Sequence, residues 1–198
     1  MARRIGLFGG TFDPPHKGHV AAATAVRDAL GLDEVRLVVA NDPWQKSGER
    51  QITPAGIRLE MTRALAGEIP GLIVDDSEIV RGGPTYTVDT LEELRIREPD
   101  VQAYVIVGSD TARRIGSWNR FADVVRLSTL VVVNRPTDAV AVPDGVPAER
   151  CEFVTMVPMT VSSTQVRERA SLGSSVADLT GEAVAALIER HGLYRSAR

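Results

Sequence analysis

The chain has 198 residues, of which 43% are hydrophobic and 25% charged, close to the average for globular proteins. We therefore expect one domain with a full hydrophobic core over residues 1–198. The net charge of −3 argues against binding to nucleic acid polymers, which usually requires a basic face. No apolar run approaches the roughly 20 residues of a membrane helix, and we expect no cleavable signal peptide. The only cysteine, Cys151, cannot form an internal disulfide, which fits a reducing, cytoplasmic compartment.

Strand-like and helix-like segments alternate through the first half of the chain. Short runs rich in Val, Ile and Leu are typical of strands that are buried on both faces of a parallel sheet. Thr53 is the expected N-cap of one helix, with Pro54 at its first helical position. The predicted elements are a strand at 4–8, a helix at 18–30, a strand at 35–40, a helix at 54–66, a strand at 72–74 and a helix at 87–97.

The second half continues the alternation and predicts the fold class. Its elements are strands at 103–107 and 130–133, a helix at 111–126 broken near Gly116, a helix from Ser162 or Ser163 to 170, and a helix at 178–191. Such an order predicts an α/β fold with one doubly wound parallel sheet and right-handed crossovers. Ligands of these sheets bind beyond the carboxyl ends of the strands.

The segment between the first strand and the first helix, residues 6–19, reads GLFGGTFDPPHKGH. Gly9 and Gly10 remove side chains where the chain turns, so that a phosphate can approach the backbone closely. Thr11 offers a hydroxyl and an amide, and the sequence Asp-Pro-Pro at 13–15 stiffens the loop. The segment therefore predicts a phosphate site.

Two histidines in this segment point to chemistry rather than binding alone. His16 and His19 are three residues apart across a helix start, so both rings point roughly the same way and lie in the positive field of the helix terminus. This arrangement suits a phosphate that acquires charge. Capping, surface exposure or metal binding are the alternatives, although no cysteine or carboxylate set with zinc spacing accompanies the pair.

Two motifs resemble the nucleotidyltransferase superfamily with an H-x-G-H motif, which has a Rossmann-like fold. The first is His-Lys-Gly-His at 16–19, and the second is Ser-Ser-Thr-Gln-Val-Arg at 162–167, which is similar to the S-S-T-x-x-R element of that superfamily. The two elements lie far apart in the chain, so chance agreement of both is not expected.

Further segments are similar to bacterial nicotinate-nucleotide adenylyltransferase. They are Gly-Pro-Thr-Tyr-Thr at 83–87, Gly-Ser-Asp at 108–110, Trp118, Asn-Arg-Pro at 134–136 and Gly-Leu-Tyr at 192–194. The resemblance covers nearly the whole chain. The chain departs from the family at Thr137, where glycine is common, and in the loop at 41–46, which keeps a lysine but not the commoner P-P-H-K form.

The resemblance implies adenylyl transfer from ATP, carried with Mg²⁺, to nicotinate mononucleotide. It implies His16 and His19 as catalytic residues. The ATP site would comprise these two residues and Gly9, Gly10, Thr11, Phe12, Gly108, Asp110, Arg135, Ser162, Ser163, Thr164 and Arg167. The acceptor site would comprise Lys46, Thr85, Tyr86, Asp110 and Trp118.

Three alternatives remain open at the level of sequence. The first is another phosphorylated acceptor, such as phosphopantetheine. The second is a dinucleotide-dependent oxidoreductase, although the glycine loop lacks the G-x-G-x-x-G pattern which that class requires. The third is a nucleotide sensor without catalysis, which would have little need for both histidines and Arg167. The sequence does not decide whether the protein forms a homo-oligomer.

Overall fold

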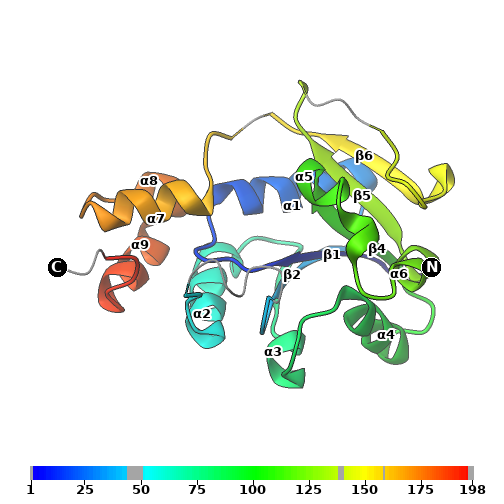
Figure 1. Cartoon of the computed structure of the whole chain (residues 1–198), viewed down its shortest axis with the longest axis horizontal. Coiled ribbons are helices and arrows are strands. Elements are labelled where there is room, and N and C mark those ends of the chain that lie inside the picture. Colours follow the sequence, from blue (N-terminus) through cyan, green and yellow to red (C-terminus); the bar gives the residue numbers. More distant parts are fainter. Residues whose placement is uncertain (1, 44–50, 138–140, 158, 196–198) are drawn as a thin grey trace.

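A single parallel sheet forms the centre of the molecule (Figure 1). The computed structural model describes residues 2–43, 51–137, 141–157 and 159–195, so that Lys46 lies outside the described residues. The strand order is β3-β2-β1-β4-β5-β6. The strands are β1 (Arg4–Gly10), β2 (Glu34–Val39), β3 (Leu72–Asp75), β4 (Gln102–Gly108), β5 (Thr129–Asn134) and β6 (Cys151–Thr155).

The strand order contains the reversal that defines a doubly wound sheet. The chain moves outward from β1 to β3, returns to place β4 beside β1, and then moves outward in the other direction. All pairs are parallel, so the carboxyl ends of all six strands lie at one edge of the sheet. The predicted α/β fold is therefore confirmed, and the reversal between β1 and β4 marks the place where such sheets bind ligands.

Helices cover both faces of the sheet, and Figure 1 shows α1 and α4 on opposite sides of it. On one face, α4 (Thr87–Arg97), α5 (Ser109–Ala112) and α6 (Phe121–Leu127) bury the side chains of Val88, Leu91, Leu94, Ala112 and Val124. On the other face, α1 (Lys17–Leu30) and α2 (Ala55–Ala66) bury Ala23, Val26 and Ala66. Burial on both faces explains why the strands are nearly continuous apolar runs.

The last three helices form a separate apolar cluster with α2, beside the carboxyl edge of the sheet (Figure 1). They are α7 (Ser163–Ser171), α8 (Ala177–Thr180) and α9 (Glu182–Arg190). Val166 of α7 and Val184 of α9 are buried together with Met61 of α2. This packing brings the carboxyl-terminal part of the chain to the loop that follows β1. Within the described residues, no helix is long and apolar enough to cross a membrane.

Several predicted boundaries were wrong for identifiable reasons. The helix expected at 178–191 is two helices, because Gly181 between them has φ 88°, which a helix does not contain. The helix expected at 111–126 is α5, a short 3₁₀ turn at Ile115–Ser117 and α6, so the break near Gly116 is confirmed. Pro54, not Thr53, is the N-cap of α2.

One strand and one α-helix were not predicted. In β6, an edge strand, only Val154 of five residues is buried, so its sequence does not read as an apolar run. Helix α3 (Ser77–Arg81) has five residues, too few to show a helical period. Cys151 begins β6, and burial and the neighbouring Glu152 raise the pKa of its thiol, which disfavours the reactive thiolate.

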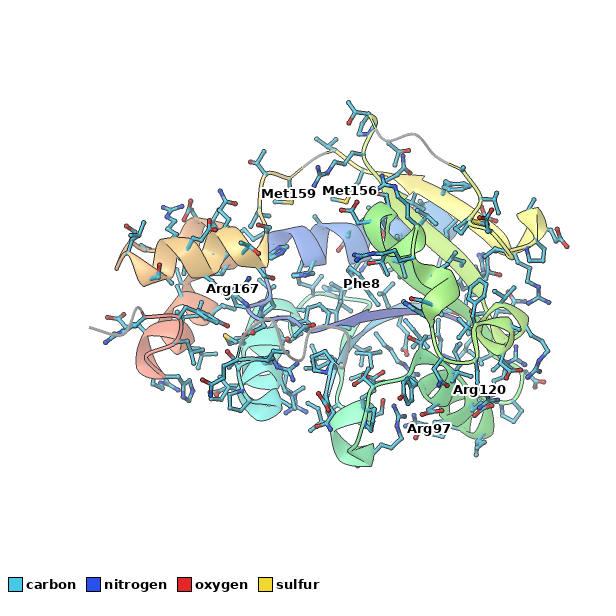
Figure 2. The ribbon with its side chains drawn as sticks, in the orientation of Figure 1. Phe8, Arg97, Arg120, Met156, Met159 and Arg167 are labelled. Carbon is cyan, nitrogen blue, oxygen red and sulfur yellow. The ribbon has the colours of Figure 1, made fainter. Side chains whose placement is uncertain are left out.

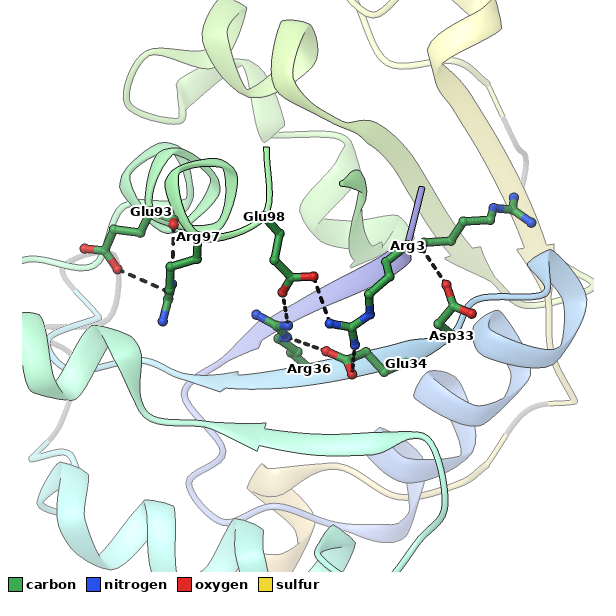
Figure 3. Close-up of polar contacts among 8 residues, drawn as sticks. Arg3, Asp33, Glu34, Arg36, Glu93, Arg97 and Glu98 are labelled. Atoms are coloured by element: carbon green, nitrogen blue, oxygen red, sulfur yellow. Dashed lines mark hydrogen bonds and ion pairs between the residues drawn. The ribbon is translucent and has the colours of Figure 1, made fainter. Parts of the chain in front are cut away.

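An ion-pair network ties the amino-terminal ends of the strands, opposite to the ligand edge (Figure 3). Arg36 of β2 binds Glu34 at 2.6 Å and Glu98 at 2.8 Å, and Arg3 binds the same two carboxylates. Because the four groups share partners in a half-buried setting, they restrain the sheet more than an isolated surface pair would. The network thus lies at the edge of the sheet opposite to the ligand site.

Candidate functional site

A cavity opens at the carboxyl ends of β1, β2 and β4, where the strand order reverses. An added Cβ at Gly9 or Gly108 would have no atom within 4 Å, so the backbone of both strands borders open space. The cavity is lined by groups from the strand ends and from the segments that cover them: Gly9, Gly10, Thr11, Ala40, Glu78, Thr85, Tyr86, Gly108, Trp118 and Asn119. It therefore lies where doubly wound sheets bind ligands.

The loop between β1 and α1 folds over the side chain of Phe12. This residue has φ 49°, a conformation that large side chains rarely adopt, and it is only 2% exposed. Its ring atoms lie 2.7–2.9 Å from the position of a Cβ at Gly10, so no larger residue fits there. The ring of Phe12 also packs edge-on against His19 at 5.0 Å between centroids. Phe12 thus packs between Gly10 and His19 and supports the loop that carries the histidines.

The two histidines stack on each other at the amino terminus of α1. Their ring centroids are 3.7 Å apart, with 28° between the ring planes. His16 is the N-cap, and its backbone N–H donates to Nδ1 of His19 at 3.1 Å. Because Nδ1 of His19 accepts this bond, the ring carries its proton on Nε2. His19 therefore presents a neutral N–H donor.

Burial makes His16 neutral as well. The residue is 8% exposed, and loss of hydration lowers its pKa from 6.5 to about 4. Within the described part of the chain, Nδ1 of His16 has no hydrogen-bond partner although it is buried. An unsatisfied buried nitrogen is costly and is most readily explained by a ligand that supplies its partner.

Arg58, which sequence analysis did not single out, joins three segments of the site. It is 1% exposed and donates to the backbone carbonyls of Thr11 at 2.7 Å, Asn41 at 3.0 Å and Thr53 at 2.7 Å. These carbonyls belong to the loop after β1, the segment after β2 and the residue before the N-cap of α2. One side chain in α2 thus holds the two loops that follow the central strands.

The second motif lies directly on the first. Ser163 donates from its hydroxyl to the carbonyl of Pro14 at 2.9 Å, across 149 positions of sequence. Arg167 extends from α7 toward the same loop (Figure 2), where it donates to the carbonyl of Asp13 at 2.9 Å and to Thr164 at 3.0 Å. Ser162 caps α7 by accepting from the backbone of Gln165. The two motifs therefore form one site.

The opposite wall of the cavity comes from the residues that precede α4. Thr85 accepts at its hydroxyl from the backbone of Asn41 at 3.1 Å, and its own N–H donates to the carbonyl of Asp42. Tyr86 is the N-cap of α4. Trp118 packs against the core while it also lines the cavity. Thr85, Tyr86 and Trp118 thus lie together, as the sequence predicted.

Glu78 of α3 is a buried carboxyl that sequence analysis missed. It lines the cavity, is 4% exposed, and accepts from the Thr90 hydroxyl at 2.9 Å. Burial raises its pKa from 4.5 to about 7, against the opposing effects of Thr90 and of the Arg81 charge. Asp75, at the end of β3, raises the pKa further. Only its position in the fold reveals this group, because a glutamate in a five-residue helix carries no sequence signal of burial.

Several predicted residues of the described chain are not part of the cavity wall. Phe12, His16, His19 and the S-S-T-x-x-R motif lie on or against the loop after β1, whereas Asp110 and Arg135 belong to other segments. Asp110 forms an ion pair with Arg113 at 2.6 Å and is not among the residues that line the cavity. Arg135 follows β5 and is exposed. Lys46 lies outside the described residues. The structure therefore brings together the glycine loop, the two histidines, the S-S-T-x-x-R motif and the segment before α4, whereas the side chains of Asp110 and Arg135 lie on α5 and after β5.

Comparison with known proteins identifies the class. A cytidylyltransferase-like family model matches residues 7–169. The fold is shared with a Plasmodium falciparum nicotinic acid mononucleotide adenylyltransferase in complex with NaAD, at a TM-score of 0.78, 17% identity and 97% coverage of both chains. The structure of a protein from Vibrio parahaemolyticus, described as a putative nicotinate-nucleotide adenylyltransferase, gives a TM-score of 0.68 and 19% identity over 98% of this chain and 97% of that one. Fold and site together define a nucleotidyltransferase.

Curated relatives identify the family within this class. A probable nicotinate-nucleotide adenylyltransferase of Albidiferax ferrireducens is 38% identical over 98% of this chain and 100% of its own length. A second, from Acidothermus cellulolyticus, is 38% identical over 97% of this chain and 94% of its own length. The chain belongs to the nicotinate-nucleotide adenylyltransferase family.

The buried carboxyl of Glu78 predicts a pH-dependent stability. Because its pKa is raised on folding, its contribution to stability is fully present below pH 4.5 and is lost as the pH rises through about 7. Glu78→Gln removes this loss. Relative to the parent protein, we expect the variant to gain stability between pH 5 and pH 8, on the order of 2 kcal/mol, measured by urea unfolding. Glu149→Gln, at an exposed glutamate, is the control. If the difference in unfolding free energy between Glu78→Gln and the parent were the same at pH 5 and pH 8, the raised pKa of Glu78 would be contradicted.

Proposed function

We propose that this protein transfers the adenylyl group of ATP to nicotinate mononucleotide, giving nicotinate adenine dinucleotide and pyrophosphate, a step of NAD biosynthesis. The observation that carries the proposal is the stacked pair of His16 and His19 at the start of α1, with the S-S-T-x-x-R motif bound to the same loop. Membership of the family supports the choice of acceptor.

The reaction requires positioning more than proton transfer. An oxygen of the acceptor phosphate attacks the α-phosphorus of ATP in line, and the bond from that phosphorus to the bridging oxygen breaks to release pyrophosphate. The attacking oxygen is already ionised, so no general base is needed. The protein accelerates such a step by holding the two phosphates together and by stabilising the charge that moves to the leaving group.

The histidines suit this role as neutral donors. His19 offers its Nε2–H, and His16, with a pKa of about 4, offers an N–H from a ring that is uncharged at pH 7. The amino terminus of α1 adds a positive field at the same place. Both groups are fixed before substrate arrives, so little reorganisation accompanies the reaction.

The remaining ATP contacts are assigned by position and by the family motifs. Ser163 and Arg167 bind the loop that leads to the histidines, and the other residues lie on that loop, on α7 or at the ends of β4 and β5. The proposed set is Gly9, Gly10, Thr11, Phe12, Gly108, Asp110, Arg135, Ser162, Ser163, Thr164 and Arg167. Phe12 would act through its backbone and through His19, since its side chain is buried.

Mg²⁺ is proposed to enter with the triphosphate. Asp13, the carboxylate of the catalytic loop, already accepts hydrogen bonds from Tyr194 and Thr53. The donor groups present thus fit a metal that the phosphates and water hold, which is how magnesium is commonly bound. Within the described ranges, no group of three or more His, Cys, Asp or Glu residues is placed to hold a metal ion. When bound, the metal would neutralise charge on the leaving pyrophosphate.

The acceptor is proposed to occupy the cavity between the glycine loop and α4. Trp118 provides a flat face for the pyridine ring, and Thr85 and Tyr86 border the opposite wall. Lys46 and Asp110 complete the proposed set on the strength of the family motifs. We further propose that residues 1–198 act as one domain, because α7 contributes directly to the loop after β1. The single cysteine, Cys151, supports a cytoplasmic, reducing setting for it.

A substrate panel tests the function. The protein is incubated with ATP, Mg²⁺ and one acceptor at a time, namely nicotinate mononucleotide, its amide or phosphopantetheine, and pyrophosphate is measured. We expect pyrophosphate and nicotinate adenine dinucleotide in equal amounts with the first acceptor. Turnover with phosphopantetheine alone would identify another acceptor, and binding of ATP without pyrophosphate release would identify a sensor.

The histidine assignment predicts a large loss of kcat. Changing His16 or His19 to Ala should lower kcat by roughly a hundredfold or more, the scale of a lost transition-state donor. The secondary structure should be retained, as followed by circular dichroism. His191 is the C-cap of α9 and contacts Glu60 of α2. His191→Ala is the matched control, because it should leave kcat unchanged. Near-normal turnover of His19→Ala would contradict the assignment.

The cavity also predicts a preference for the acid over the amide. No Lys or Arg lies between Gly83 and Thr90, so this segment cannot bind the acceptor carboxylate through a salt bridge. N–H groups in the first turn of α4, which begins at Thr87 beside the cavity, have no partner within the helix and can donate to both carboxylate oxygens.

An amide would turn its NH₂ donors toward one of these N–H groups and leave it unpaired. The expected cost is about 1–3 kcal/mol, which corresponds to a roughly ten- to hundredfold lower kcat/KM. The measurement is kcat/KM for both mononucleotides at saturating ATP. Equal values, or a preference for the amide, would overturn this account of the cavity while leaving adenylyl transfer intact.

A further inference from the structure

The hydroxyl of Tyr194, near the carboxyl end of the chain, contacts the loop that carries the histidines. It donates to Oδ1 of Asp13 at 2.6 Å, across 181 positions of sequence. Asp13 is 2% exposed and accepts at its other oxygen from the backbone of Thr53. A hydrogen bond to a buried carboxylate is among the strong kinds, so this contact restrains the loop more than a neutral surface bond would.

The backbone of Tyr194 is held in an unfavourable conformation to make this contact. Its φ is 61°, in the left-handed region that aromatic residues avoid. Such a conformation persists only where the surroundings impose it. Here Leu193 and Tyr194 pack against the apolar cluster of α2, α7 and α9, which includes Met61 and Val166. The segment at Leu193 and Tyr194 is therefore held in a defined position against the site.

Three contacts from the carboxyl-terminal region converge on two consecutive loop residues. Tyr194 binds the side chain of Asp13, Arg167 binds its carbonyl, and Ser163 binds the carbonyl of Pro14. His16 follows two residues later and begins α1 as its N-cap. The position of both imidazoles thus depends on the placement of Asp13 and Pro14.

We propose that Tyr194 is a positioning residue for adenylyl transfer, which acts through Asp13 to hold His16 and His19 in place. The proposal rests on the proposed function, because the histidines are taken as the groups that stabilise the transition state. Tyr194 itself does not line the cavity between the glycine loop and α4. Its effect is therefore expected on turnover rather than on substrate binding.

Removal of the hydroxyl alone tests this role. Tyr194→Phe keeps the ring in the apolar cluster and should lower kcat by roughly tenfold to a hundredfold, the scale of a small misplacement of catalytic groups. The KM values for ATP and acceptor should change by less than about threefold. Tyr104→Phe is the matched control, because its hydroxyl accepts from Arg4 at 2.8 Å at the opposite end of the sheet. A Tyr194→Phe enzyme with the kcat of the control would overturn the proposal.

A double-mutant cycle separates positioning from a general loss of stability. If Tyr194 acts through the histidines, Tyr194→Phe should have little further effect on kcat in a His19→Ala background, because the two changes remove the same interaction. Effects that multiply in full would show that Tyr194 acts independently of His19 and would contradict the proposal.

Hydrogen exchange tests the proposal without reference to activity. Amides of residues 11–19 should exchange faster in Tyr194→Phe than in the parent, whereas Tyr104→Phe should leave them unchanged. Unchanged exchange in Tyr194→Phe would overturn the role of Tyr194 whatever the reaction is. If the loop of Tyr194→Phe exchanges faster but the parent protein releases no pyrophosphate, the contact of Tyr194 with the loop is supported. Catalytic positioning is then rejected, and the result counts against the proposed function.

Discussion

The site depends on one buried guanidinium. Arg58 is 1% exposed and donates to carbonyls in three chain segments, which are the loop after β1, the segment after β2 and the residue before the N-cap of α2. Burial of a charge costs several kcal/mol unless hydrogen bonds compensate it, so the three bonds of this side chain favour the arrangement in which all three segments stay in place. The carboxyl-terminal helices then close on the same loop through Ser163 and Arg167. A parallel sheet supplies the loops, and Arg58 fixes their relative position.

Rigid placement and burial together set the chemistry of the histidines. His16 is neutral because burial lowers its pKa to about 4, and His19 is oriented by the backbone N–H that its Nδ1 accepts. Two neutral donors beside a helix terminus stabilise charge without a fixed cation that would bind ground state and transition state alike. In the proposed function, an incoming phosphate would supply the partner that buried Nδ1 of His16 lacks among the described residues.

The fold and the core of the site could be predicted from sequence because their signals are local. Buried parallel strands are continuous apolar runs, and the glycine loop, the paired histidines and the S-S-T-x-x-R motif are contiguous segments. What sequence missed depends on contacts between distant residues. Nothing local marks Arg58 as buried, Glu78 as a cavity wall or Tyr194 as a partner of Asp13. The edge strand β6 was missed because one of its faces is largely exposed.

The protonation of the histidines is the claim on which the mechanism rests, and nitrogen-15 NMR of the imidazoles measures it directly. The chain has three histidines, so the ring signals can be assigned with single His→Ala variants. At pH 7.5 we expect His19 to be neutral with its proton on Nε2, and we expect His16 to stay neutral down to about pH 5 because its pKa is about 4. A protonated Nδ1 on His19, or a His16 that titrates near its ordinary pKa of 6.5, would contradict this claim.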